Sequence, residues 1–87
     1  MMTLPEKLSR EVERVTVMRE RLYDAAVERR RINPKDDVAD LKLVIKTMNA
    51  AIEAAHKAAG EGDASSIVAA VVPLGRFKEA WEAGRTP

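Results

Sequence analysis

Residues 38–59, VADLKLVIKTMNAAIEAAHKAA, decide the fold of this 87-residue chain. Within this stretch, apolar residues recur at alternating intervals of three and four: Val38, Leu41, Ile45, Met48, Ile52, Ala55 and Ala59. This spacing places them along one face of an α-helix, and it is typical of a helix that buries that face against another helix. The stretch therefore predicts a long amphipathic helix that requires a partner helix.

A second stripe with the same period precedes this stretch. It comprises Leu4, Leu8, Val15, Met18, Leu22, Ala25 and Ile32, and it is widened by Val12 and Ala26. The helix is predicted to start at Thr3-Leu4-Pro5-Glu6, because Thr3 can cap, Pro5 suits a first turn and Glu6 completes a capping box. Glu11 and Arg29 interrupt the stripe. We interpret both as polar side chains that reach water near the helix ends. The alternative is that they fix the register in which the two helices pack.

Asn33-Pro34-Lys35-Asp36 separates the two stripes. Pro34 disfavours a helical conformation at the residue before it, so the first helix should end near Ile32. Asn33 is then expected to cap a second helix that starts at Pro34. We predict helices over about 4–32 and 34–59 that fold back as an antiparallel hairpin roughly 40 Å long. Positions equidistant from the turn should pack together: Ala25 with Ile45, Leu22 with Met48, Met18 with Ile52, and Val15 with Ala55.

The C-terminal third is predicted to form a kinked helical segment over about 64–83. Gly60 should end the preceding helix, and Asp63 can cap the new one. Pro73 and Gly75 are expected to break or kink the segment. One of its stripes should cover the alanine-lined end of the hairpin: Ile67, Ala70, Leu74, Phe77 and Trp81. Three further apolar residues lie off that stripe and are left for a second chain: Val68, Val71 and Val72.

These patterns together predict a single all-α domain, a long antiparallel hairpin plus a kinked C-terminal helical segment. A chain of this length buries a modest fraction of its surface, and the absence of cysteine removes disulfides as reinforcement. We therefore predict a homodimer, assembled as a helical bundle with coiled-coil-like packing. The predicted interface comprises Ile67, Val68, Val71, Val72, Leu74, Phe77 and Trp81.

The charges narrow the class of protein. Lys and Arg number 15 and Asp and Glu 14, for a net charge of +1, and both signs are interleaved as on a solvated helical surface. No apolar run approaches the roughly 18 residues that a membrane span needs. The segment from Met1 to Glu13 lacks the apolar centre of a signal peptide. We expect a soluble cytoplasmic protein that does not contact a membrane.

Reactive side chains are few. The chain has no cysteine and a single histidine, His56, and Ser65 and Ser66 are expected to form hydrogen bonds in the first turn of a helix. We therefore predict neither enzyme activity nor a cofactor. The favoured function is that of a small regulator, adaptor or inhibitor that self-associates and binds a protein partner through its helical surface.

His56 supports two lesser alternatives. Ala55-His56-x-x-x-Gly60 resembles the histidine phosphotransfer module over six residues, which implies a phosphoryl-accepting histidine, although Ala59 stands where that module carries lysine. Glu53-x-x-His56 matches the spacing of di-iron carboxylate bundles, which implies a metal site completed by Glu11 and a second copy. A contact between Glu11 and His56 is the structural alternative to both.

The most basic part of the chain is Arg29-Arg30-Arg31, with Lys35 close by. Contact with phosphate or nucleic acid through these four residues is the alternative function. The structural explanation is that arginines in the last turn of a helix interact favourably with its dipole. Under that explanation, three acidic residues neutralise the cluster: Asp36, Asp37 and Asp40. Tyr23 is the one aromatic residue nearby that could stack on a base.

Overall fold

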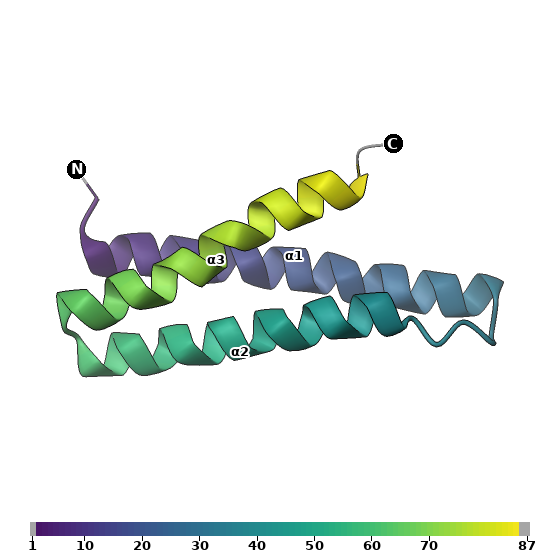
Figure 1. Cartoon of the computed structure of the whole chain (residues 1–87), viewed down its shortest axis with the longest axis horizontal. Helices are drawn as coiled ribbons and strands as arrows, with labels where there is room; N and C mark the ends of the chain where they lie inside the picture. The colour runs from purple at the N-terminus through teal and green to yellow at the C-terminus, as the bar shows by residue number, and fades with distance from the viewer. Residues whose placement is uncertain (1, 86–87) are drawn as a thin grey trace.

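The chain folds into three helices in a computed structural model that describes the backbone of residues 2–85 and the side chains of residues 2–77. They are α1 (Leu4–Ile32), α2 (Ala39–Glu61) and α3 (Ala64–Arg85), and each packs against the other two (Figure 1). The described part of the chain contains no strand. The all-α prediction is confirmed, including the helical assignment of the β-branched run at 67–74.

The ends of α1 lie where the sequence places them. At the start, the Thr3 hydroxyl accepts a hydrogen bond from the Glu6 N–H at 3.3 Å, which satisfies one of the free donors of the first turn. At the end, Asn33 has an extended conformation, with φ −135° and ψ 96°, as its position before Pro34 demands. Its N–H still reaches back to the Arg29 carbonyl at 2.8 Å.

The start of α2 differs from the prediction, because the helix begins at Ala39 and not at Pro34. Asn33 uses its side chain within the turn: its Oδ1 accepts from the Lys35 N–H at 3.2 Å, and its carbonyl accepts from the Asp36 N–H at 2.9 Å. Asparagine stabilises turns in this way and so competes with helix formation. The N-cap of α2 is Val38, with φ 49°.

The end of α2 is also displaced from the predicted position. The helix continues through Gly60 to Glu61, and the residue in the left-handed region is Gly62, with φ 77°. The Gly62 N–H donates to the Ala58 carbonyl at 2.9 Å. Asp63 caps α3 as predicted, because its Oδ2 accepts from the Ser66 N–H at 3.0 Å.

Of the break or kink predicted at Pro73 and Gly75, the break does not occur. α3 is helical from Ala64 to Arg85 and runs through both Pro73 and Gly75. A proline inside a helix removes one backbone hydrogen bond. Here Pro73 and Gly75 lie on the exposed side, while buried residues precede and follow them on the other side: Ile67, Ala70, Leu74 and Phe77. Packing on both sides of the proline therefore holds the helix together.

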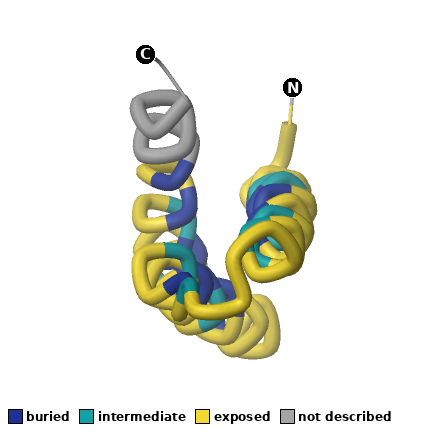
Figure 2. The backbone as a smooth tube through the Cα atoms, turned by 90° about the vertical axis from the view of Figure 1, so that its right-hand side faces the viewer, coloured by how far each residue is buried: buried dark blue, intermediate teal, exposed yellow. Residues whose placement is uncertain are grey.

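One apolar core joins the three helices, on the sides that face one another (Figure 2). It consists of Leu8, Val15, Met18, Leu22, Ile45, Met48, Ile52, Ala55, Ala58, Ile67, Ala70, Leu74 and Phe77. Val38 is also buried, at 2% exposed. Most residues of the predicted stripes therefore face inward, although Leu4 and Ala59 are exposed, and α3 covers the alanine-rich end of the hairpin as expected. Ile32 is an exception at 72% exposed, because the loop opposite it leaves the last turn of α1 uncovered.

Polar contacts agree with the predicted register of the hairpin. Arg19 Nη1 donates to Asn49 Oδ1 at 2.8 Å, within one turn of the predicted Leu22–Met48 pair. Nearer the turn, Arg29 pairs with Asp40. Positions equidistant from the loop therefore face each other.

The molecule is elongated and thin, with extents of 46 × 25 × 14 Å. Its radius of gyration is 14.7 Å, whereas a compact domain of this length has about 12 Å. The long dimension matches the roughly 43 Å that a 29-residue helix spans. Such a shape leaves a large share of the residues exposed. Among the described residues, no helix is both long enough and apolar enough to cross a lipid bilayer.

Candidate interaction surfaces

The structure divides the predicted interface between two sides of α3. Ile67, Leu74 and Phe77 are buried in the core of the same chain, and Val71 is partly buried against it. Val68 and Val72 point away from the core and are 48% and 51% exposed. The side chain of Trp81 lies outside the described residues. The part of the predicted set that is free to meet another molecule is therefore centred on Val68 and Val72.

The exposed residues of α3 that surround Val68 and Val72 are also uncharged. Residues 64–75, ASSIVAAVVPLG, contain no charged side chain, although 33% of the whole chain is charged. We define the α3 outer face as the exposed residues of this segment: Ala64, Ser65, Val68, Ala69, Val72, Pro73 and Gly75. Most of them are small, so another backbone could approach this surface closely.

The three consecutive arginines at the end of α1 have different partners. Arg29 Nε and Nη2 donate to the two carboxylate oxygens of Asp36, at 2.9 and 3.1 Å. Arg29 Nη1 donates to both oxygens of Asp40, at 3.0 and 2.8 Å. This clasp, formed by Arg29, Asp36 and Asp40, joins the end of α1 to the loop and to the first turn of α2.

The clasp changes the acidity of both carboxyl groups. Hydrogen bonds from the Val38 N–H and from Arg29 lower the pKa of Asp36 below its ordinary value. The hydrogen bonds from Arg29 likewise lower the pKa of Asp40. Both carboxylates therefore favour the folded state when they are ionised.

Arg31 pairs with Glu28 on the outer surface of α1, so it too has a carboxylate partner. Arg30 and Lys35 make no ion pair with any described residue. Successive residues on a helix point about 100° apart, which separates the three arginines. The predicted cluster of Arg29, Arg30, Arg31 and Lys35 is therefore not one continuous basic patch.

Arg30 instead faces lysines of α2 across a groove of about 430 Å³ between α1 and α2. We call this the hairpin groove, and its lining residues are Tyr23, Ala26, Val27, Arg30, Val38, Lys42, Ile45, Lys46 and Asn49. Three of them are cationic, and no acidic residue is among the described lining residues. The heptad pattern of a single helix does not predict this group, because its members lie on two helices. The signal for it was the hairpin register, which places Arg30 and Tyr23 opposite Lys42 and Lys46.

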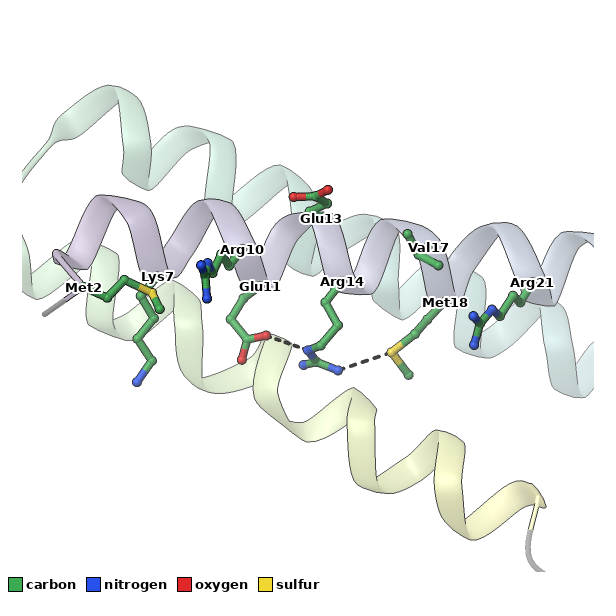
Figure 3. Close-up of a pocket in the computed structure, with 9 residues that line it drawn as sticks. All are labelled: Met2, Lys7, Arg10, Glu11, Glu13, Arg14, Val17, Met18 and Arg21. Carbon is green, nitrogen blue, oxygen red and sulfur yellow. Dashed lines mark hydrogen bonds and ion pairs between the residues drawn. The ribbon is translucent and has the colours of Figure 1, made fainter.

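A larger open hollow of about 740 Å³ lies along α1 beside α3 (Figure 3). Its charges are mixed: Lys7, Arg10, Arg14 and Arg21 with Glu11 and Glu13. Arg14 is held on three sides, by Glu11 Oε2 at 2.6 Å, by Met18 Sδ at 3.3 Å and by the Leu74 carbonyl at 2.9 Å. Because Arg14 reaches the α3 backbone, we interpret it as a link between α1 and α3.

His56 is exposed and borders a small cavity of about 260 Å³, near the ends of the three helices. The other lining residues are mostly apolar: Pro5, Leu8, Ser9, Val12, Ala55, Ala59, Gly62 and Ile67. The structure pairs Glu11 with Arg14, in the hollow beside α3, and not with His56. Glu53 is exposed on α2. Among the described residues, no three histidine or acidic side chains come together as metal ligands.

No protein-family model matches the chain, and neither a curated protein nor a solved structure is significantly similar to it.

Proposed function

We propose that this chain is a non-catalytic interaction protein that self-associates through the α3 outer face. The observation that supports this most directly is the absence of charge from residues 64–75, in a chain where the other helices alternate charged and apolar residues. Folding accounts for the buried side of α3, which completes the core. It does not require Val68 and Val72 on the exposed side, where each is about half exposed. An exposed apolar face of this kind marks interaction sites.

The occupant we propose is a second copy of the same face. A surface without charges suits a partner surface without charges, because burying an unpaired charge against it would be costly. In a two-fold dimer, the same residues come from both chains, so each valine can pack beside the small residues of the other copy, such as Ala69. Oligomerisation also reinforces small domains, and this one is only 14 Å thick.

The mass in solution tests the proposal. Wild-type protein should have twice the 9.6 kDa mass of the chain in size-exclusion chromatography with light scattering. Changing Val72 to Asp should give the single-chain mass, because an aspartate buried at the centre of the interface would have no partner. Val71→Asp should have the same effect if the interface extends to that partly buried side.

Leu43→Asp is a matched control, because Leu43 is an exposed leucine on α2, at 66% exposed, and lies outside the α3 outer face. This variant should keep the dimer mass. Circular dichroism should show the same helix content for all variants, so that loss of the dimer is not loss of the fold. A monomeric wild type, or a Val72→Asp variant with unchanged mass, would contradict self-association through α3.

We further propose that the dimer acts as a regulator, adaptor or inhibitor of a protein partner, which binds the surfaces of the hairpin that α3 leaves exposed. Pull-down from the native host with mass spectrometry should return that partner, and a Val72→Asp bait should show whether its capture depends on the dimer. Nucleic-acid contact through Arg29 and Arg31 is not part of the proposal, because both hold carboxylates.

A further inference from the structure

The hairpin groove differs in charge and position from the α3 outer face. All of its lining residues come from α1, the loop before α2, or α2 itself. None of its lining residues therefore belongs to the α3 outer face. Its three cations are Arg30 on α1 and Lys42 and Lys46 on α2, and the two lysines lie one helical turn apart on the same face.

Of the acidic residues near the groove in sequence, Asp24 and Asp37 make no ion pair with a described residue, and the others are held by arginines outside the groove. Arg29 alone holds both Asp36 and Asp40. Glu28 pairs with Arg31. Arg29 holds two carboxylates, so the clasp as a whole has a net charge of −1, whereas the lining of the groove has three cations and no acidic residue. A concave surface lined by one sign of charge attracts ligands of the opposite sign.

The groove also offers an aromatic ring and an amide. Tyr23 and Val27 are exposed on its α1 side and provide a flat apolar wall. Asn49 Oδ1 accepts from Arg19 Nη1 at 2.8 Å, which leaves the amide nitrogen of Asn49 to donate to a ligand. In proteins that bind single-stranded nucleic acid, an aromatic ring stacks on the base while nearby cationic side chains bind the phosphate.

The floor of the groove has an unusual conformation. Val38 lines it with φ 49°, a left-handed conformation that is rare for a β-branched residue. The conformation is held because its N–H donates to Asp36 Oδ1 at 2.9 Å, its carbonyl accepts from the Lys42 N–H at 2.9 Å, and its side chain is buried. Such outliers persist where the surroundings fix them, and they cluster at ligand sites. The same Asp36 thus holds both Arg29 and the groove floor.

We infer that the hairpin groove binds a nucleotide unit, with the base against Tyr23 and the phosphate between Arg30, Lys42 and Lys46. The volume of about 430 Å³ lies within the range of small-molecule sites. A free nucleotide and one residue of a single-stranded nucleic acid share this chemistry. The inference does not depend on self-association, because no residue of the α3 outer face takes part.

The test is a titration of the ¹⁵N-labelled full chain, followed by NMR. AMP should shift the amide signals of Tyr23, Arg30, Lys42, Lys46 and Asn49, while adenosine without phosphate should shift them little. The double variant Lys42→Glu/Lys46→Glu should weaken binding about tenfold or more, because each charged hydrogen bond to phosphate is strong. Tyr23→Leu, which keeps an apolar side chain but removes the ring, should weaken it about fivefold or more.

Lys7→Glu/Lys57→Glu is the matched control, because it makes the same change in net charge at two exposed lysines outside the groove. AMP affinity should be unchanged in this variant. An equal loss in both double variants would show attraction by net charge alone and would overturn the site. So would the absence of shifts at millimolar AMP, or their location away from the groove.

An octamer of thymidine separates the two sources of nucleotide. If the octamer binds more tightly than AMP, and if the salt dependence of its binding is weaker in Lys42→Glu/Lys46→Glu, the ligand is single-stranded nucleic acid. Equal or weaker binding identifies a free nucleotide. Displacement of AMP by a poly-glutamate peptide at similar concentration would show a site for carboxylates and would overturn the nucleotide assignment.

Discussion

The hairpin and the first half of α3 contribute to one core, but their outward sides differ. On the hairpin, exposed charged side chains, some in ion pairs such as Arg31–Glu28, are interleaved with exposed apolar ones such as Val27 and Leu43. On α3, residues 64–75 present valine, alanine, proline and glycine to solvent. A small helical protein needs apolar residues on its inner sides only. The outward sides therefore differ in charge, and the uncharged one on α3 is the surface that we propose contacts a second copy.

The largest effect should come from the inner side of α3. Leu74 is fully buried, so Leu74→Ala should lower the free energy of unfolding by about 2–5 kcal/mol, measured by urea denaturation. Met48→Ala on α2 should cost a similar amount, since both side chains lie in one core. The control is Leu43→Ala, which should change stability by about 0.5 kcal/mol or less because Leu43 is exposed. A stable Leu74→Ala variant would mean that α3 does not pack on the hairpin, and the distinction between its sides would fail.

Replacing the two glycines near the end of α2 with alanine should change stability in opposite directions. Gly62 has φ 77°, so Gly62→Ala should destabilise the protein by about 1–2 kcal/mol. Gly60 lies within α2 with open space around its Cα, so Gly60→Ala should stabilise it by roughly 0.5–1 kcal/mol. Thermal melts of the two variants would check the opposite signs. Destabilisation by Gly60→Ala, with stabilisation by Gly62→Ala, would place the end of α2 at Gly60 instead.

The smallest effect should be the dependence of the clasp on pH. Asp36 and Asp40 have pKa values lowered by folding, so their contribution is present above the ordinary carboxyl pKa and is lost as pH falls through the folded values. Arg29→Met should reduce the loss of stability between neutral and strongly acidic pH. Arg30→Met should leave that loss as in wild type, because Arg30 pairs with no described carboxylate. Identical pH profiles for the two variants would show that the clasp does not contribute to stability.

The sequence predicted the elements that depend on periodic burial. The stripes through Val15 and Ile52, and the segment around Leu74, all lie in the core, because a repeat of three and four residues fixes which side of a helix is apolar. Thr3 and Asp63 were identified as caps because their side chains act within one turn. These features are local, and a single sequence is enough to show them.

Features that depend on contacts between distant residues, or on a choice between alternative hydrogen bonds, could not be predicted in this way. Asn33 could cap a helix or close a turn, and the contacts that decide between them come from the folded loop. Nothing in the sequence marks Val38 as left-handed, since its conformation is held by Asp36 and by burial. The hairpin groove was missed because Tyr23 and Lys46 lie on different helices and meet only in the folded hairpin.

A spin-label distance between two chains tests self-association through α3 most directly. The chain has no cysteine, so Arg76→Cys places one label on the exposed side of α3, next to the α3 outer face. If two copies cross near Val68 and Val72, the two labelled backbone positions should lie within about 20 Å of each other, as helix rise and interhelical spacing require. Dipolar coupling between chains at that range, lost in a Val72→Asp background, is the predicted result. Absence of coupling between chains at concentrations where wild type is fully assembled would contradict the proposed interface.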